Sequence, residues 1–143
     1  MYTERFSETH YPLLIEHADS IGPAATASSW VNVANYHRLI FVLDVGDIGQ
    51  TGTIDAQLYQ ATDTSGTGAK VITGKAITQL TQAGGDGDQV VCIECRTEEL
   101  DVTGGFDCVK VLLTTGTAAS EYSWILYGLV SRFEPVPTTN WAE

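Results

Sequence analysis

The sequence predicts an all-β protein: an antiparallel β-sandwich of Ig-like or jelly-roll type with extended arms at both ends. Three observations predict this fold class. From Ser28 onward, short runs rich in β-branched and aromatic residues are separated by clusters of Gly, Asp, Thr and Ser. Thr53–Ala61 alternates polar with apolar residues, which is typical of a half-buried strand. No segment carries a long, convincing helical pattern of apolar residues.

Residues 1–27 are expected to form an N-terminal arm outside the sandwich. Apolar residues in this stretch fall at helical spacing over too short a run for a stable helix: Tyr11, Leu14, Ile15 and Ala18. The segment Gly22–Ala27 follows as a breaker and linker. We therefore expect an extended arm that contains at most one helical turn.

Residues 28–133 are expected to form the sandwich domain, and residues 134–143 a C-terminal tail. The expected strands are Trp30–Val33, Tyr36–Val45, Thr53–Ala61, Ala69–Leu80 with an interruption at Gly74, and Val90–Cys95. In the tail, Pro135 and Pro137 remove the amide donors that an interior strand needs. The tail is therefore a second arm.

The last strand pair is expected to be a β-hairpin over Phe106–Phe133, with its turn at Thr115–Thr117. Both of its strands are apolar on both faces, and so is Tyr36–Val45. A two-layer sandwich covers only one face of each sheet, so these strands need a further cover. The cover is either the chain's own arms or another subunit, and the shortness of the arms favours a subunit.

The expected subunit interface combines aromatic and apolar residues of these strands with a possible anchor in the tail. The residues are Tyr36, Phe41, Tyr122, Trp124, Leu126, Tyr127 and Trp141.

Composition limits the partners. Seven Lys and Arg stand against eighteen Asp and Glu, and the formal charge of −11 opposes contact with a nucleic-acid backbone. Only 17% of residues are charged, which is low for a lone soluble domain and indicates that part of its surface is covered by a partner.

The apolar run Leu39–Leu43 is far shorter than the ~20 residues of a membrane helix, and no secretory signal is recognisable. We expect a soluble product made in a cytoplasm.

Three cysteines do not form a closed disulfide framework, because their number is odd. Cys92 and Cys95 have the CxxC spacing of zinc and redox sites. Residues three apart on a strand point to opposite faces, however, so core packing explains them better.

Other motifs fail on spacing. Gly68–Ala76 resembles a phosphate-binding loop but has one residue too many between its glycines, which favours a strand with a glycine bulge. Asp63, Asp86 and Asp88 lie in glycine-rich loops without the pattern of a calcium loop. No nucleophile elbow is present. The sequence predicts no catalytic residue, cofactor or metal ligand, and a protein that is not an enzyme.

Trp30, Tyr59 and Trp141 permit one binding hypothesis. Aromatic rings of this kind supply large contact area with a polar end, as in a sugar-stacking platform. The alternative is that they anchor the core or an interface.

Residues from Leu39 to Pro135 resemble small structural proteins of tailed bacteriophages, of the capsid decoration or cement kind. The resemblance rests on Phe41–Gly46, Thr53–Asp63, Gly66–Lys70, Glu99–Phe106 and the closing strands that end at Arg132–Pro135.

This resemblance implies a β-sandwich or jelly-roll subunit that binds the outer surface of a phage head and stabilises it, often as a homotrimer. The implied partners are the major capsid protein and copies of itself, and the implied location is the virion after synthesis in the host bacterial cytoplasm. It carries no catalytic residues. Alternatives are another virion component, a head-tail connector or tail protein, and a carbohydrate-binding β-sandwich module.

Overall fold

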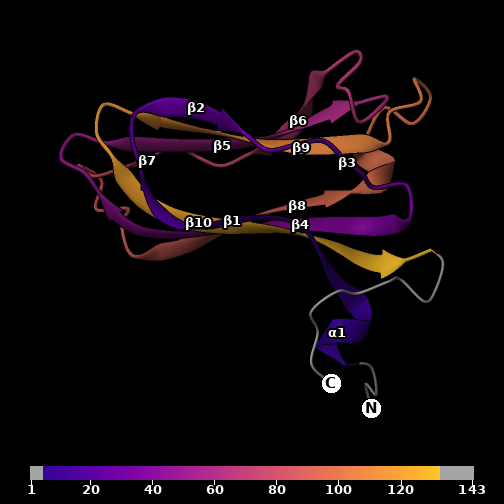
Figure 1. Cartoon of the computed structure of the whole chain (residues 1–143), viewed down its shortest axis with the longest axis horizontal. Helices are drawn as coiled ribbons and strands as arrows, with labels where there is room; N and C mark the ends of the chain where they lie inside the picture. Colours follow the sequence, from indigo (N-terminus) through magenta and orange to yellow (C-terminus); the bar gives the residue numbers. More distant parts are fainter. Residues whose placement is uncertain (1–4, 133–143) are drawn as a thin grey trace.

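The computed structural model describes residues 5–132, which form two antiparallel sheets packed face to face (Figure 1). The elements are α1 (Phe6–Thr9), β1 (His10–Ile21), β2 (Ala24–Ala27), β3 (Val31–Asn32), β4 (Tyr36–Ile48), β5 (Thr53–Ala61), β6 (Lys70–Ala76), β7 (Leu80–Thr81), β8 (Gln89–Arg96), the 3₁₀ turn η1 (Thr97–Glu99), β9 (Cys108–Gly116) and β10 (Ser120–Ser131). The all-β sandwich predicted from the sequence is confirmed.

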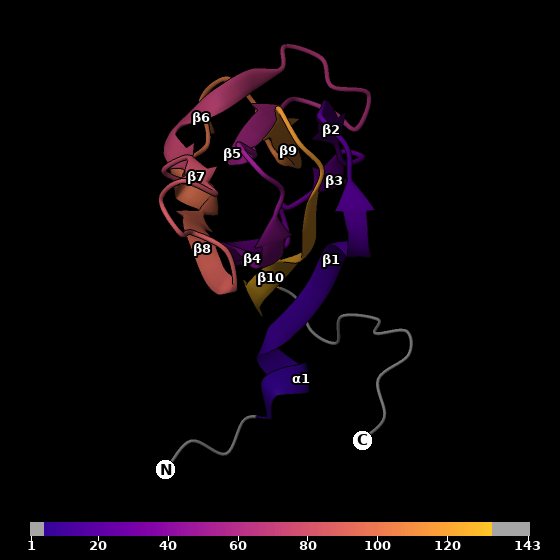
Figure 2. The same ribbon diagram turned by 90° about the vertical axis from the view of Figure 1, so that its left-hand side faces the viewer.

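The strand order identifies the sandwich as a jelly roll. Sheet A has the order β1-β10-β4-β8, and sheet B the order β2-β9-β5-β6, with the short strands β3 and β7 paired to β9 and β5. Successive long strands cross from one sheet to the other, except for β5 and β6, which are neighbours in sheet B. Two interlocked Greek keys of this kind make a jelly roll and not an Ig-like sandwich. Figure 2 shows the two layers from the end, with β1 and β2 at one side.

The predicted closing hairpin is wrong. β9 pairs with β5 and β2 in sheet B, whereas β10 pairs with β4 and β1 in sheet A. The chain leaves β9 at Gly116, adopts a left-handed conformation at Thr117 (φ 68°) and enters the other sheet at Ser120. A glycine-containing turn fits either a hairpin or a crossing, so the local pattern does not distinguish them.

The boundary of the N-terminal arm is also wrong. β1 adds to the edge of sheet A beside β10, and β2 adds to the edge of sheet B beside β9. Register shifts interrupt β1 between Pro12 and Leu14 and between Glu16 and Asp19, which removes the two-residue period from its sequence. The residues at helical spacing, from Tyr11 to Ala18, lie in the strand β1, and the helical turn α1 precedes them. The predicted C-terminal tail lies outside the described residues.

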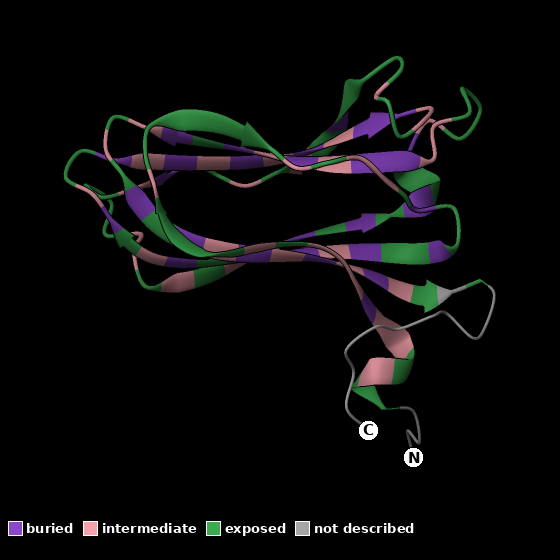
Figure 3. Cartoon of the chain, viewed as in Figure 1, coloured by how far each residue is buried: buried purple, intermediate pink, exposed green. Residues whose placement is uncertain are grey.

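The core lies between the sheets and follows strand alternation (Figure 3). On β5 the predicted inner residues Ile54, Ala56 and Leu58 are buried, while their neighbours are half-buried. Across the core, the hydroxyl groups of Thr115 on β9 and Tyr122 on β10 form a 3.1 Å hydrogen bond between the sheets. This bond gives both buried hydroxyl groups a partner inside the sandwich.

Gly128 gives the Tyr36 ring its place in the core. A Cβ atom at residue 128 would lie 2.6 Å from the nearest atom of the Tyr36 ring. That ring is buried and packs against Tyr11, with ring centroids 6.0 Å apart. The glycine in the middle of β10 is therefore a packing requirement, since a side chain there has no free volume.

Gly128→Ala should lower the free energy of unfolding by about 1 to 3 kcal/mol, because the added methyl group must displace a buried ring. Urea unfolding followed by tryptophan fluorescence measures the loss. Gly22→Ala is the matched control, because a Cβ atom at Gly22 meets no atom within 4 Å. Equal stability of the two variants would contradict this account of the core.

Candidate subunit interface

The outer face of sheet A is apolar across the middle of its strands, apart from Glu94 on the edge strand β8. Register places outward residues in cross-strand rows, and two central rows are Tyr127, Ile40 and Glu94, and Ile125, Val42 and Cys92. β1 continues these rows with Pro12 beside Tyr127 and Ile15 beside Ile125. Ile15 is 53% exposed, and its row neighbours Ile125 and Val42 are half-buried. We call this set, with Leu129 in the next row, the apolar band.

Strand alternation produces the apolar band. On β4, Leu39, Phe41 and Leu43 point into the core, so Ile40 and Val42 between them point outward. β10 follows the same rule around Trp124 and Leu126 (Figure 3). Because β4 and β10 are neighbours in the middle of sheet A, their outer apolar residues lie side by side.

The helix α1 adds an aromatic ring to the apolar band. The Phe6 ring stacks on His10 with centroids 4.1 Å apart and meets Tyr127 edge-on at 5.9 Å. Phe6 nevertheless remains 56% exposed. The helix thus enlarges the exposed apolar surface at this end of the sheet.

The outer face of sheet B is polar by contrast. β5 presents Thr53, Asp55, Gln57 and Tyr59 there, as the alternation of its sequence predicts. The next strand, β9, presents Lys110 beside Tyr59. The two outer faces therefore differ in character. An exposed apolar patch such as the one on sheet A marks an interaction surface.

The predicted interface residues lie mostly in the core. Tyr36, Phe41, Tyr122, Trp124 and Leu126 are each at most 7% exposed and pack between the two sheets. This corrects the assignment, since side chains already enclosed by the fold have no surface left to offer. The predicted residues lie on the strands that carry the apolar band, but their side chains point to the opposite face, into the core.

Of the remaining predicted interface residues, Tyr127 lies in the apolar band. Trp141 lies outside the described residues. Ile40, Val42 and Ile125 were not among the predicted interface residues. Their face is nevertheless marked by charged neighbours, because Arg38 and Asp44 share the alternation of Ile40 and Val42.

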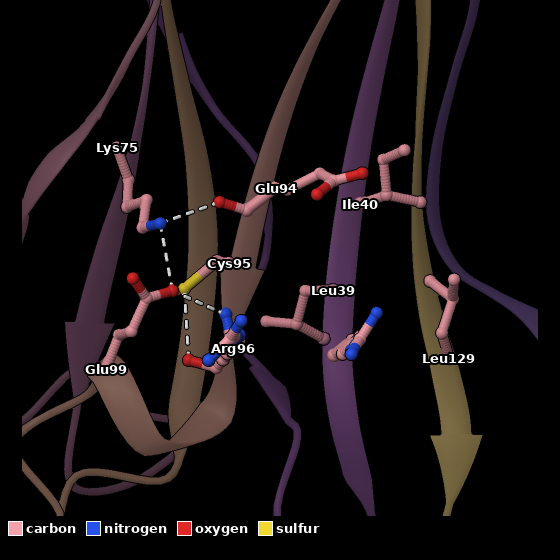
Figure 4. A pocket seen from close by; sticks show the side chains of 9 residues that line it. Leu39, Ile40, Lys75, Glu94, Cys95, Arg96, Glu99 and Leu129 are labelled. Atoms are coloured by element: carbon pink, nitrogen blue, oxygen red, sulfur yellow. Dashed lines mark hydrogen bonds and ion pairs between the residues drawn. The ribbon is translucent and has the colours of Figure 1, made fainter.

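A pocket of about 460 Å³ opens at one end of sheet A (Figure 4). Its lining residues are Arg38, Leu39, Ile40, Lys75, Glu94, Cys95, Arg96, Glu99 and Leu129. Lys75 is already engaged, with its Nζ atom 2.9 Å from Glu99 Oε2 and 2.8 Å from the Glu94 carbonyl oxygen. These contacts with Lys75 hold the pKa of Glu99 below its ordinary value. The pocket contains no nucleophile paired with a base and serves as the charged border of the apolar band.

The aromatic platform assembles in part. Trp30 and Tyr59 both flank Lys110 on the outer face of sheet B, with the Lys110 ammonium 4.9 and 5.4 Å from the two ring centroids. The rings thus already hold a cation by cation–π contact. Lys110 stands where a stacked sugar would meet the rings, which weakens the carbohydrate hypothesis.

The CxxC residues point to opposite faces, as predicted: Cys92 is exposed and Cys95 is buried. Asp63 accepts hydrogen bonds from the Thr67 side chain and from the backbone amides of Thr67 and Ser65, and these bonds lower the pKa of Asp63. Asp86 accepts one from the Thr81 amide. Both acidic loops are thus organised by their own side chains. Within residues 5–132, no group of three or more His, Cys, Asp or Glu is arranged to hold a metal ion.

The Gly68–Ala76 segment contains the β6 strand, and Gly74 has the left-handed conformation expected of a glycine bulge (φ 75°). None of the helices between residues 5 and 132 has the length and apolarity needed to cross a membrane.

No family model and no curated protein matches this sequence. A solved structure with a similar fold is the electron cryo-microscopy structure of the empty virus-like particle of Cowpea Mosaic Virus. The match has a TM-score of 0.45 and 10% sequence identity, and covers 96% of this chain and 91% of that chain. A likeness at this level carries no argument about family or function.

Thiol labelling tests which face of β8 is outward. In dilute solution, iodoacetamide should modify Cys92 first, because Cys92 is exposed. Burial raises the pKa of Cys95 and of Cys108 to about 11, so both should react only after unfolding. Peptide mass spectrometry after labelling at pH 8 separates the sites, and Cys92→Ser is the control. Labelling of Cys95 as fast as Cys92 would reverse the assignment of the faces.

Proposed function

We propose that this chain is a structural subunit of a virus particle, of the capsid-decoration or cement kind. The apolar band on the outer face of sheet A carries the proposal, because it gives the domain a surface whose natural use is contact with another protein subunit. The partners in this proposal are the major capsid protein and copies of this chain.

The fold supports the proposal without deciding it. Jelly rolls build many viral capsid domains, but also lectins and cupins, so the topology alone does not assign a function. The net charge of −11 favours the outside of a nucleic-acid-filled shell over its interior. Charge and apolar band together favour an external structural subunit.

The mechanism of such a subunit is mechanical. Apolar area that leaves water between subunits stabilises their contact by about 25 cal/mol per Å², before the cost of ordering and of lost rigid-body freedom. A shell carrying such contacts resists separation of its subunits. Stabilising a shell in this way requires a rigid domain with one apolar binding face, and it requires no catalytic group.

Particle association tests the proposal. We expect virus particles purified from cells that produce this chain to contain it in their sedimenting fraction. An antibody against the chain should bind intact particles, since a decoration subunit lies outside. Mass spectrometry of the gradient fractions and immunogold electron microscopy measure the two results. A chain that stays in the unsedimented fraction throughout would refute a virion role, and one hidden until particles are opened would refute the decoration role.

A glycan-binding experiment distinguishes this proposal from the alternative of a carbohydrate-binding module. We expect Trp30→Ala and Tyr59→Ala to leave particle association unchanged, because both rings lie on sheet B, away from the apolar band. A glycan array probed with the unaltered chain and with both variants is the measurement. Specific glycan binding lost in both variants would favour a carbohydrate-binding module instead.

A further inference from the structure

We propose that the partner covering the outer face of sheet A is a second copy of this chain, packed back to back about a two-fold axis that lies in the interface and runs perpendicular to β4. This inference rests on the proposed function, because it names the partner of the same surface. It is carried by the charges at the two ends of the apolar band.

The charged residues on the outer face of sheet A are separated along the strands, with basic residues at one end and acidic residues at the other. The end row contains Arg38 and Arg96, which are cross-strand neighbours, with Leu129 beside them. Two rows follow that are apolar except for Glu94. At the opposite end of the face stand Asp44, between Ser123 and Val90, and then Glu121. All four charged residues are exposed.

Few of these charges are paired among the described residues 5–132. Arg38 and Asp44 take part in none of the ion pairs among residues 5–132. Arg96 has one exposed contact, 3.3 Å from Glu98. Because Arg38 and Arg96 lie directly opposite each other on adjacent strands, their like charges destabilise the isolated sheet. A carboxylate from outside relieves this repulsion.

The face is self-complementary under only one of two simple two-fold rotations. An axis parallel to the strands would place the basic end of one copy over the basic end of the other. An axis perpendicular to the strands reverses their direction and places the basic end over the acidic end. Complementary potentials fix the orientation of an interface, so the second arrangement is selected.

The positions along β4 fit this rotation. An axis above Phe41 exchanges residue 38 with residue 44 and residue 40 with residue 42. Arg38 then faces Asp44 of the other copy, and Ile40 faces Val42. Glu94, the one charge in the central rows, lies on the edge strand β8 and so falls at the rim.

The size of the face is sufficient for a weak dimer. Four strands about 4.8 Å apart, with the seven residues from 38 to 44 that the axis superposes at about 3.3 Å rise, give a footprint of roughly 440 Å² per copy and about 890 Å² for both. That value is just below the ~1,000 Å² of a stable biological interface, which is typical of a weak and transient one. The dimer should therefore form reversibly, with dissociation in the accessible micromolar range.

Charge reversal provides the test. Arg38→Glu places two carboxylates opposite each other, and Asp44→Arg places two cations opposite each other, at both symmetric contacts of the dimer. Each variant should weaken self-association roughly tenfold or more. An equimolar mixture of the two should form a heterodimer as tight as the unaltered dimer, because every facing pair is again opposite in charge. Sedimentation velocity over a concentration series measures all four samples.

The controls are reversals on the polar outer face of sheet B, Lys110→Glu and Asp55→Arg, which should leave the dimer unchanged. Ile125→Asp places a charge in the apolar band and should abolish the dimer. Circular dichroism should show the native fold in each variant, since all these positions are at the surface.

Three outcomes would overturn the inference. They are an unaltered chain that remains monomeric at several hundred micromolar, a mass that grows to a trimer, and single reversals that leave the dimer intact. A partner other than a second copy would also appear as a monomer here. Particle association is measured separately, so a dimer absent from particles refutes only the proposed function, and a particle-bound monomer refutes only the dimer.

Discussion

The pairing of β4 with β10 is the constraint on which the rest of this structure depends. These two strands run side by side from Tyr36 opposite Ser131 to Ile48 opposite Ser120. Their inner residues, with Phe41 against Trp124 at a ring-centroid distance of 5.6 Å, fill the middle of the core. Since both strands are also apolar on the outside, their pairing at the centre of sheet A necessarily creates one continuous outer apolar surface.

The two-residue period predicted the sandwich but not the sheet to which each strand belongs. On β5 the apolar residues Ile54, Ala56 and Leu58 are buried as the alternation predicts, because alternation is a local property of the chain. Sheet membership depends on contacts between distant segments, such as β1 with β10. The turn after β9 is compatible with a hairpin, and only the long-range pairing excludes it. β1 was missed because its register shifts break the period.

Alternation alone does not show which face of a strand points outward when both faces are apolar. This is the case on β10, where the large aromatic residues Tyr122 and Trp124 were predicted to lie in the interface. Large aromatic side chains gain most from full burial, so they belong in the core. Glu121 and Ser123 share the alternation of Ile125 and Tyr127, and a charged residue on an otherwise apolar strand marks the outer face.

In the proposed dimer, apolar burial and charge have different effects: one sets the affinity and the other the orientation. Apolar burial has no direction, so the band alone would permit many relative orientations of two subunits. The net charge of −11 opposes approach of two copies at long range, although salt at physiological strength screens this repulsion beyond about 8 Å. Contacts such as Arg38 with Asp44 act at shorter range and only in one orientation. The apolar band therefore supplies the affinity, and the charged residues at its two ends, Arg38 and Arg96 at one and Asp44 at the other, supply the orientation.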